Sequence, residues 1–187
     1  MSIINTTIQP FKTTAFQNGK FIEVSDQTLK GKWSVLIFMP AAFTFNCPTE
    51  VEDAADNYAA FKDAGAEVYI VTTDTHFSHK VWHETSPAVG KARFPLVGDP
   101  THTLTRMFGV HIEEEGLALR GTFIANPDGV IKTAEIHDNA IARDVKETLR
   151  KLQAAQYVAK NPGQVCPAKW QEGAKTLTPS LDLVGKI

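Results

Sequence analysis

Two long apolar runs mark the first half of the chain. Residues 33–39, WSVLIFM, are ended by Pro40, and residues 66–74, AEVYIVTTD, form a second run rich in Val, Ile and Tyr. Such continuous runs are typical of central strands that are covered on both faces. Between them, residues 50–65 place apolar side chains at helical spacing and stop at Gly65, which predicts a helix. The pattern therefore predicts a buried strand, a helix and a second buried strand in succession.

Turn and capping signals predict the shorter elements. Asn18-Gly19, between two strand-like runs, predicts a hairpin near the N-terminus, and the NPDG sequence at residues 126–129 predicts a second hairpin. Residues 75–87 predict a helix that is capped by Thr75. The other expected elements are a strand within residues 94–100 and a helix at residues 103–108.

The last regular element is a long amphipathic helix. It is predicted for residues 140–159, with one apolar side made of Ile141, Val145, Leu149 and Leu152. After Asn161 the periodicity is lost, and the chain reads as a tail.

The order of these elements predicts the fold class. Helices alternate with strands, and a hairpin and a helix follow, which is the order of an α/β layered fold with a mixed sheet. Thioredoxin-like folds have this pattern: a central mixed sheet flanked by helices, here with an N-terminal hairpin and a C-terminal tail. We expect a thioredoxin-like domain in residues 1–160 and an arm in residues 161–187, and 187 residues suffice for one proper core.

Composition narrows the class of function. Charged residues make up 21% of the chain and the net charge is −2, so there is no basic footprint for nucleic acid or an anionic membrane. We find no signal-peptide pattern at the start and no apolar run long enough to span a membrane, and we expect a cytoplasmic protein. Two cysteines are too few for a disulfide scaffold, and in a reducing compartment they are inert, catalytic or redox-sensing.

Cys47 lies where a thiol can be activated. The sequence Cys47-Pro48-Thr49-Glu50 reads as the start of a helix, with Pro48 at the first helical position and Cys47 at or beside the N-cap. The positive end of the helix dipole favours a thiolate there. The loop also follows a predicted strand, at the sheet edge where active sites gather. The alternative is that Cys47 fills space beneath the aromatic residues of FTF, residues 43–45.

The motifs around the two cysteines resemble those of a known family. The spacing of Pro40, Thr44 and Cys47 in PAAFTFNCPTE is that of the peroxiredoxin active site, and GQVCPAKW around Cys166 is similar to the resolving-cysteine motif of typical two-cysteine peroxiredoxins. The resemblance runs the whole length of the chain and is closest to the peroxidase subunits of bacterial alkyl hydroperoxide reductases. Asn46 and Ala42 depart from residues that are frequent in the family, valine and aspartate respectively.

The resemblance implies roles for residues near Cys47. Cys47 would be the peroxidatic thiolate, which attacks the peroxide and becomes a sulfenic acid. Thr44 would hydrogen-bond the peroxide, although a threonine at this spacing also suits a plain turn. Pro40 would shield the sulfenate from water, and Arg120 would stabilise the thiolate and polarise the peroxide.

Further residues would support this site. The resemblance implies that Glu50 and Arg143 orient Arg120, and that Trp82 packs near the loop. Cys166 of a partner subunit would attack the sulfenic acid and form an intersubunit disulfide. From the residues alone, Cys166 can equally pair within its own chain.

The implied activity is that of a thiol-dependent peroxidase. It would reduce hydrogen peroxide and organic hydroperoxides to water and alcohols, in antioxidant defence and redox homeostasis. The implied partners are a flavoprotein disulfide reductase, which is the reductase component of an NADH-dependent alkyl hydroperoxide reductase system, and further copies of the chain in a homodimer and a decamer of five dimers. No metal, haem or flavin is expected in the chain.

Two other functions remain as alternatives. A thioredoxin-like disulfide reductase normally needs Cys-x-x-Cys, and Cys47 has Glu50 in the second position. A ring-shaped holdase chaperone is the non-enzymatic alternative. A metal site at His76, His79 and His83 is disfavoured against a partly exposed polar helix face, and the run Glu113-Glu114-Glu115 is expected to be a solvated loop.

Overall fold

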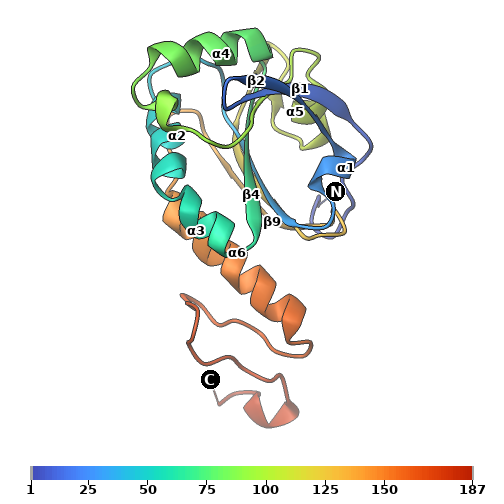
Figure 1. Cartoon of the computed structure of the whole chain (residues 1–187). Helices are drawn as coiled ribbons and strands as arrows, with labels where there is room; N and C mark the ends of the chain where they lie inside the picture. The colour runs from blue at the N-terminus through green and yellow to red at the C-terminus, as the bar shows by residue number, and fades with distance from the viewer. Residues whose placement is uncertain (1, 187) are drawn as a thin grey trace. The chain divides into compact units, whose positions relative to one another are not determined.

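The computed structural model describes residues 2–186, which divide into two compact units between residues 145 and 146. Within the described residues, the first unit is built on a seven-stranded sheet with the order β2-β1-β5-β4-β3-β8-β9 (Figure 1). The strands are β1 Lys12–Gln17, β2 Lys20–Ser25, β3 Trp33–Phe38, β4 Ala66–Thr72, β5 Leu96–Gly98, β8 Arg120–Ala125 and β9 Ile131–His137. β4 runs parallel to both β3 and β5, and the other neighbours are antiparallel, so the predicted mixed sheet is confirmed.

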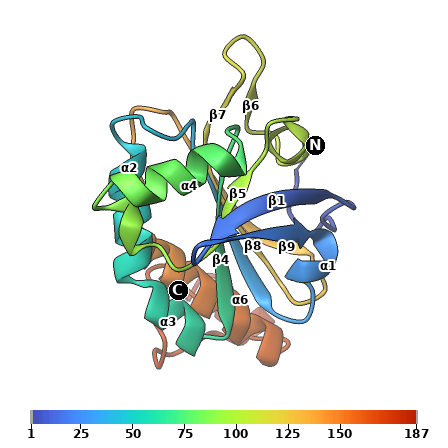
Figure 2. The ribbon, with the colours of Figure 1, turned by 45° about the horizontal axis from the view of Figure 1, so that its top comes forward.

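Helices cover both faces of this sheet. The helices of the first unit are α1 Asp26–Leu29, α2 Cys47–Asp56, α3 Tyr58–Asp63, α4 His76–Thr85 and α5 Thr103–Met107, with a 3-10 turn, η1, at Val89–Lys91. Figure 1 shows α2 and α3 on one side of β4 and α1 on the other, and the rotated view in Figure 2 agrees. A small hairpin of β6 His111–Ile112 and β7 Leu117–Ala118 stands beside the sheet.

The central strands are buried on both faces, as their continuous apolar runs predict. In β3, Leu36 and Phe38 join a core cluster that includes Leu104 and Phe108 of the α5 region. The alternate residues of a strand point to the opposite face, so Val35 lies against the side that carries α2 and α3. The sheet is thereby fixed from both sides, and the loops at its carboxyl edge start from rigid strands.

Most predicted elements are confirmed. The Asn18-Gly19 turn joins β1 to β2, and both residues have positive φ, 49° and 77°, as a type I′ turn requires. The predicted single helix at residues 50–65 is instead two helices, α2 and α3, because the helix is broken at Asn57. α2 also begins earlier, at Cys47, so Pro48 occupies the second helical position and not the first.

The predicted start of the long helix is wrong. The helix α6 spans Val145–Lys160, and Ile141 lies in the preceding loop with its side chain exposed. The backbone there is engaged elsewhere: Ala140 N–H donates to the Asp138 carboxylate, and Arg143 N–H donates to Glu50. A helix that began at residue 140 would bond the Arg143 N–H to the Asn139 carbonyl, but this N–H donates to Glu50 and this carbonyl accepts from Arg120, so the helix begins later. The short elements α1, β6 and β7 have no counterpart in the prediction.

The second unit consists of most of α6 and the chain that follows it. Arg150 donates to the Trp170 carbonyl at 2.8 Å, and Trp170 lies against Tyr157 with ring centroids 5.1 Å apart. An isolated bridge joins Val165 to Leu177, and a 3-10 turn, η2, follows at Leu181–Leu183. The boundary predicted between residues 160 and 161 stays a prediction. No helix within residues 2–186 is long and apolar enough to cross a membrane.

Candidate active site

The loop between β3 and α2 delivers Cys47 to the first turn of a helix. The chain leaves β3 at Phe38 and enters α2 at Cys47, with Asn46 at the N-cap. The sulfur therefore lies at the partly positive end of a ten-residue helix. Cys47 is free and fully buried, with 0% of its surface exposed.

The aromatic neighbours of Cys47 do not cover it. Phe45 is 99% exposed, and Phe43 is also exposed, with its backbone at φ +60°. Left-handed backbone is strained for a bulky residue and is found preferentially at functional sites. The alternative in which Cys47 fills a core beneath these rings therefore loses its main support.

Arg120 is the charged group that contacts the sulfur. Its Nη1 donates to Cys47 Sγ at 3.5 Å and to Glu50 Oε2 at 2.6 Å, and its Nε donates to the Asn139 carbonyl at 2.8 Å. The guanidinium is buried at the end of β8 and held from two directions. This contact places a fixed positive charge directly beside the sulfur.

Glu50 and Arg143 brace this arginine. The Arg143 guanidinium binds the Glu50 carboxylate in a bidentate manner, at 2.8 and 3.0 Å, and Arg143 Nη1 donates to the Gly121 carbonyl. Burial alone would raise the pKa of Glu50, but the hydrogen bonds of Arg143 and the charges of both arginines hold that pKa below its ordinary value. One carboxylate between two guanidiniums leaves one positive charge, which a thiolate at Cys47 would neutralise.

A buried hydrogen-bond chain holds the loop before Cys47. Ala42 N–H donates to the Asp74 carboxylate at 2.7 Å, and the Thr72 hydroxyl oxygen lies 2.7 Å from the same carboxylate oxygen. His79 lies 2.8 Å from that hydroxyl through Nε2, and its Nδ1 lies 3.1 Å from the Leu96 carbonyl. Burial lowers the pKa of His79 to about 4, against the attraction of Asp74.

This chain corrects the prediction of a partly exposed histidine face at His79, whereas His76 and His83 are partly exposed as predicted. His79 is fully buried and both its ring nitrogens have partners, because α4 turns that side onto the sheet. Within residues 2–186, no group of three or more His, Cys, Asp or Glu side chains is arranged to hold a metal ion. Glu113 of the acidic run lies exposed in a hairpin loop and pairs with Arg106 at 2.9 Å.

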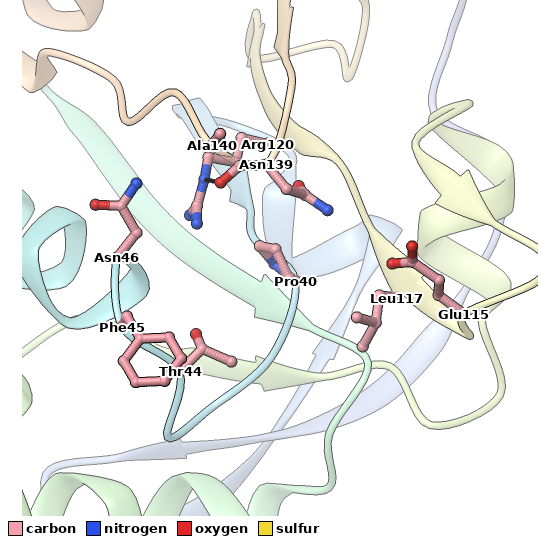
Figure 3. A pocket seen from close by; sticks show the side chains of 9 residues that line it. All are labelled: Pro40, Thr44, Phe45, Asn46, Glu115, Leu117, Arg120, Asn139 and Ala140. Atoms are coloured by element: carbon pink, nitrogen blue, oxygen red, sulfur yellow. Dashed lines mark hydrogen bonds between the residues drawn. The ribbon is translucent and has the colours of Figure 1, made fainter.

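A pocket of about 510 Å³ opens beside Arg120. It is lined by Pro40, Thr44, Phe45, Asn46, Glu115, Leu117, Arg120, Asn139 and Ala140 (Figure 3). The predicted residues Pro40 and Thr44, from the loop after β3, thus meet the predicted Arg120 at the start of β8. The Thr44 hydroxyl donates to the Ala41 carbonyl at 2.9 Å, so it also serves the turn that is the alternative role for this residue.

Five predicted site residues do not line this pocket: Cys47, Glu50 and Arg143, which lie behind Arg120 in the contacts described above, and Trp82 and Cys166. Trp82 is buried on α4, with its ring centroid 6.2 Å from that of Phe43. Cys166 belongs to the second unit, where its sulfur lies 3.9 Å from the Ala154 carbonyl. Burial raises the pKa of the Cys166 thiol, while the nearby Arg150 opposes this.

Sequence reasoning missed Asp74, Asn139, Glu115 and Leu117. Asp74 follows a strand directly at its carboxyl end, which is a usable signal in α/β folds. Glu115 belongs to the acidic run that was predicted only as a solvated loop, and Asn139 and Leu117 come from a loop and a two-residue strand that no periodicity marks.

Two family models match the chain. The AhpC/TSA family model matches residues 4–134, and the model of the C-terminal domain of 1-Cys peroxiredoxin matches residues 154–186. The first match spans more than half of the chain and includes Cys47 and Arg120, and the second includes Cys166.

Relatives match over full length. The chain is 80% identical over 187 residues to alkyl hydroperoxide reductase C of Pseudomonas aeruginosa (strain UCBPP-PA14), and 54% identical to that of Escherichia coli (strain K12), with all of each chain covered. The crystal structure of Enterococcus faecalis AhpC matches with a TM-score of 0.87 and 42% identity, over 89% of this chain and 100% of that one. Reduced 2-Cys peroxiredoxin of Plasmodium vivax matches with a TM-score of 0.92 and 28% identity, over 97% and 96%.

Proposed function

The chain belongs to the AhpC/TSA family and is a peroxidase that reduces hydroperoxides, and we propose that Cys47 is the thiol that attacks the peroxide. The observation that carries this assignment is the Arg120 guanidinium 3.5 Å from Cys47 Sγ, braced by the buried Glu50 and Arg143. This arrangement supplies a positive charge beside both the thiolate and the peroxide oxygen that departs when the O–O bond breaks.

The proposed first step forms one bond and breaks one. The Cys47 thiolate attacks the terminal oxygen of the hydroperoxide, the O–O bond breaks, and the electron pair leaves with the alkoxide, which takes a proton to become an alcohol. Cys47 is left as a sulfenic acid. Arg120 stabilises the developing negative charge without giving up its own proton. Thr44 hydrogen-bonds the peroxide and Pro40 excludes water, at the pocket that both side chains line.

The second step makes a disulfide. We propose that Cys166 of a partner subunit attacks the sulfenic acid and releases its oxygen as water. The raised pKa of Cys166 means that this thiol must lose its proton on approach. Because Cys47 is fully buried, the first turn of α2 or the preceding loop must open before any second thiol can reach it.

The proposed partners complete the cycle. A disulfide reductase must return the two thiols, and we propose a flavoprotein, the reductase component of an NADH-dependent alkyl hydroperoxide reductase system. We propose the cytoplasm as the compartment, since the cycle needs a reducing environment. We also propose a homodimer that assembles into a decamer of five dimers, for which the exposed apolar cluster of Phe21, Phe77 and Val81 supplies a candidate contact.

A gel tests the chemistry and the pairing together. One equivalent of hydrogen peroxide is added to the reduced protein, and the products are separated without reductant. We expect a covalent dimer in the wild-type protein and none in Cys47→Ser or Cys166→Ser. A monomer with an internal disulfide would contradict the intersubunit pairing, and retained peroxide consumption in Cys47→Ser would contradict the assignment of the nucleophile.

The same variants separate the alternatives. A disulfide reductase would reduce insulin disulfides at a rate that Cys47→Ser abolishes, yet would consume no peroxide. A holdase would suppress aggregation of a client protein equally well in the wild type and in Cys47→Ser. Stoichiometric peroxide consumption that depends on Cys47 is expected of neither.

A further inference from the structure

We propose that Glu115 and Leu117 of the β6–β7 hairpin select the substrate, so that the pocket favours uncharged alkyl hydroperoxides over those that carry a carboxylate. This inference rests on the proposed function of Cys47 and adds a substrate class to it. The two residues reach the pocket from the side opposite Phe45 and Asn46, as Figure 3 shows.

The pocket has an apolar wall around a polar centre. Pro40, Phe45 and Leu117 give it hydrocarbon surface, and Phe45 is almost wholly exposed, so its ring is free to meet a ligand. A peroxide group at Arg120 would leave an organic tail against this surface, where burial of apolar area is favourable. Hydrogen peroxide has no organic tail, so it gains no binding free energy from this apolar surface.

The described pocket lining has one positive and one negative side chain, and only the negative one is free to meet the tail of a substrate. Of the nine described residues that line it, Arg120 and Glu115 carry charge. Arg120 is already paired with Glu50 at 2.6 Å, and its remaining positive charge is directed at Cys47. Glu115 is exposed and faces the opening, so a carboxylate on the substrate tail meets a like charge while an ammonium group meets an opposite one.

The hairpin holds Glu115 in place. Glu115 N–H donates to the Ile112 carbonyl at 3.2 Å, and Gly116 N–H donates to the same oxygen at 2.9 Å. Gly116 has φ +67°, which lets the turn close. Arg106 fixes the other arm through a bidentate pair with Glu113, at 2.9 and 3.0 Å. The carboxylate of Glu115 is therefore attached to a defined turn and not to a free loop.

Three matched substrates test the charge selection. A short alkyl hydroperoxide is prepared with a terminal carboxylate, as its methyl ester, and with a terminal ammonium group, and kcat/KM is measured for each. Glu115→Gln is expected to raise kcat/KM for the carboxylate roughly two- to fivefold, to lower it for the ammonium compound by a similar factor, and to leave the ester unchanged. The difference in kcat/KM between the wild type and Glu115→Gln should become smaller as salt is added, because exposed charges are screened.

The controls separate this inference from the proposed function. Glu114→Gln removes a charge from the same turn without touching the pocket lining, and it should leave all three values unchanged. Leu117→Ala should lower the ratio of kcat/KM for the ester to kcat/KM for hydrogen peroxide, because only the ester has a tail to place against this side chain. Equal changes in Glu114→Gln and Glu115→Gln, or no change in either, would overturn the selection by Glu115 even though the enzyme works. Failure of the wild type to reduce any peroxide would instead overturn the proposed function.

Discussion

Glu50 is the one carboxylate of residues 2–186 that pairs with both buried arginines of the site. Its two oxygens take hydrogen bonds from Arg120 and from both the side chain and backbone of Arg143, and all three residues are buried. A buried charge cluster of this kind is tolerated only while every member keeps its partner. The carboxylate thus determines the position of the guanidinium that faces Cys47.

Glu50→Gln is expected to damage both activity and stability. The change leaves two buried guanidiniums without an anion, and breaking such a pair costs about 3–5 kcal/mol. Arg120 also loses its orientation, so we expect kcat/KM for hydrogen peroxide to fall at least tenfold, as measured by stopped-flow kinetics. Glu52→Gln is the control, because Glu52 lies on the same helix but pairs with Lys91 at the surface. Equal losses in the two variants would contradict the role of Glu50.

Because the pKa of Glu50 is lowered, the stabilisation by this carboxylate should also depend on pH in the acid range. A carboxyl group whose pKa is lower in the folded than in the unfolded chain stabilises the fold above its unfolded pKa of about 4.5. That stabilisation is lost as the pH falls through the lower pKa that Glu50 has in the folded chain. The free energy of unfolding of the wild type should therefore drop in this acid range, and Glu50→Gln should drop less.

His79 is expected to control stability at milder acidity. Its pKa is about 4 in the folded protein against an ordinary value of 6.5, so between these pH values the unfolded chain binds a proton that the folded chain does not. The free energy of unfolding should fall with pH from about 6.5 downward, by on the order of 3 kcal/mol at the lower end. The carboxylate of Asp74 and the ring of His76 act on the same group in opposite directions.

Urea titrations at several pH values check this prediction. His79→Asn removes the group, and its free energy of unfolding should be less dependent on pH than that of the wild type. His83→Asn is the matched control on the same helix, because His83 is only part-buried and contacts the Ala92 carbonyl. A pH dependence that disappears in His83→Asn but persists in His79→Asn would contradict the assignment.

At the scale of elements, the sequence predicted those whose signals are local. The hairpin at Asn18-Gly19 was predicted from a turn chemistry that only a few residues satisfy, and β3 and β4 from continuous apolar runs. The start of helix α2 was predicted from Pro48 and Glu50, and the helix begins one residue earlier than that, at Cys47. These signals lie within a few residues of the structure they encode, which is why they can be read without a fold.

The failures arose where tertiary contacts override local pattern. Ile141 fits the apolar stripe of a helix, but the backbone of Arg143 is bound to Glu50, which is 93 residues away in sequence. His79 was predicted on an exposed face because the sheet that buries it is not visible in the helical pattern. Pocket residues such as Asn139 depend on three loops meeting, and no single segment encodes that meeting. The cysteine motifs, by contrast, were found because their spacing is short.

The cap of α4 provides a test at this scale. The Thr75 hydroxyl accepts from Ser78 N–H at 3.3 Å, and this helix carries both His79 and Trp82. Thr75→Ala is expected to cost about 1 kcal/mol of unfolding free energy, because one amide of the first turn loses its partner. Thr75→Ser keeps the hydroxyl and should keep most of that stability in urea unfolding. If the serine variant loses as much as the alanine variant, packing of the methyl group and not capping is responsible.

At the scale of the whole molecule, one group of exposed apolar side chains lies on α4 and β2. Phe77 is 60% exposed, Val81 48% and Phe21 45%, and the Phe21 and Phe77 rings pack edge to face with centroids 5.3 Å apart. The His76 ring contacts both of these rings, with centroids 4.7 Å from Phe21 in an edge-on arrangement and 4.1 Å from Phe77 in a tilted one. A cluster of large exposed apolar residues favours association with another protein surface, and a second copy of the chain is the occupant that the proposed decamer provides.

Phe77→Asp is therefore expected to break the assembly without stopping the chemistry. A buried phenylalanine contributes a large apolar area to an interface, and an aspartate there adds a charge that must be desolvated. Sedimentation velocity should show the wild type as a species of ten 20.5 kDa chains and Phe77→Asp as dimers. Phe77→Leu keeps the apolar character and should stay assembled. Because each dimer holds complete Cys47 and Cys166 pairs in the proposed cycle, Phe77→Asp should still form the covalent dimer after peroxide. If Phe77→Asp sediments like the wild type, the proposal that this cluster forms part of the interface is wrong.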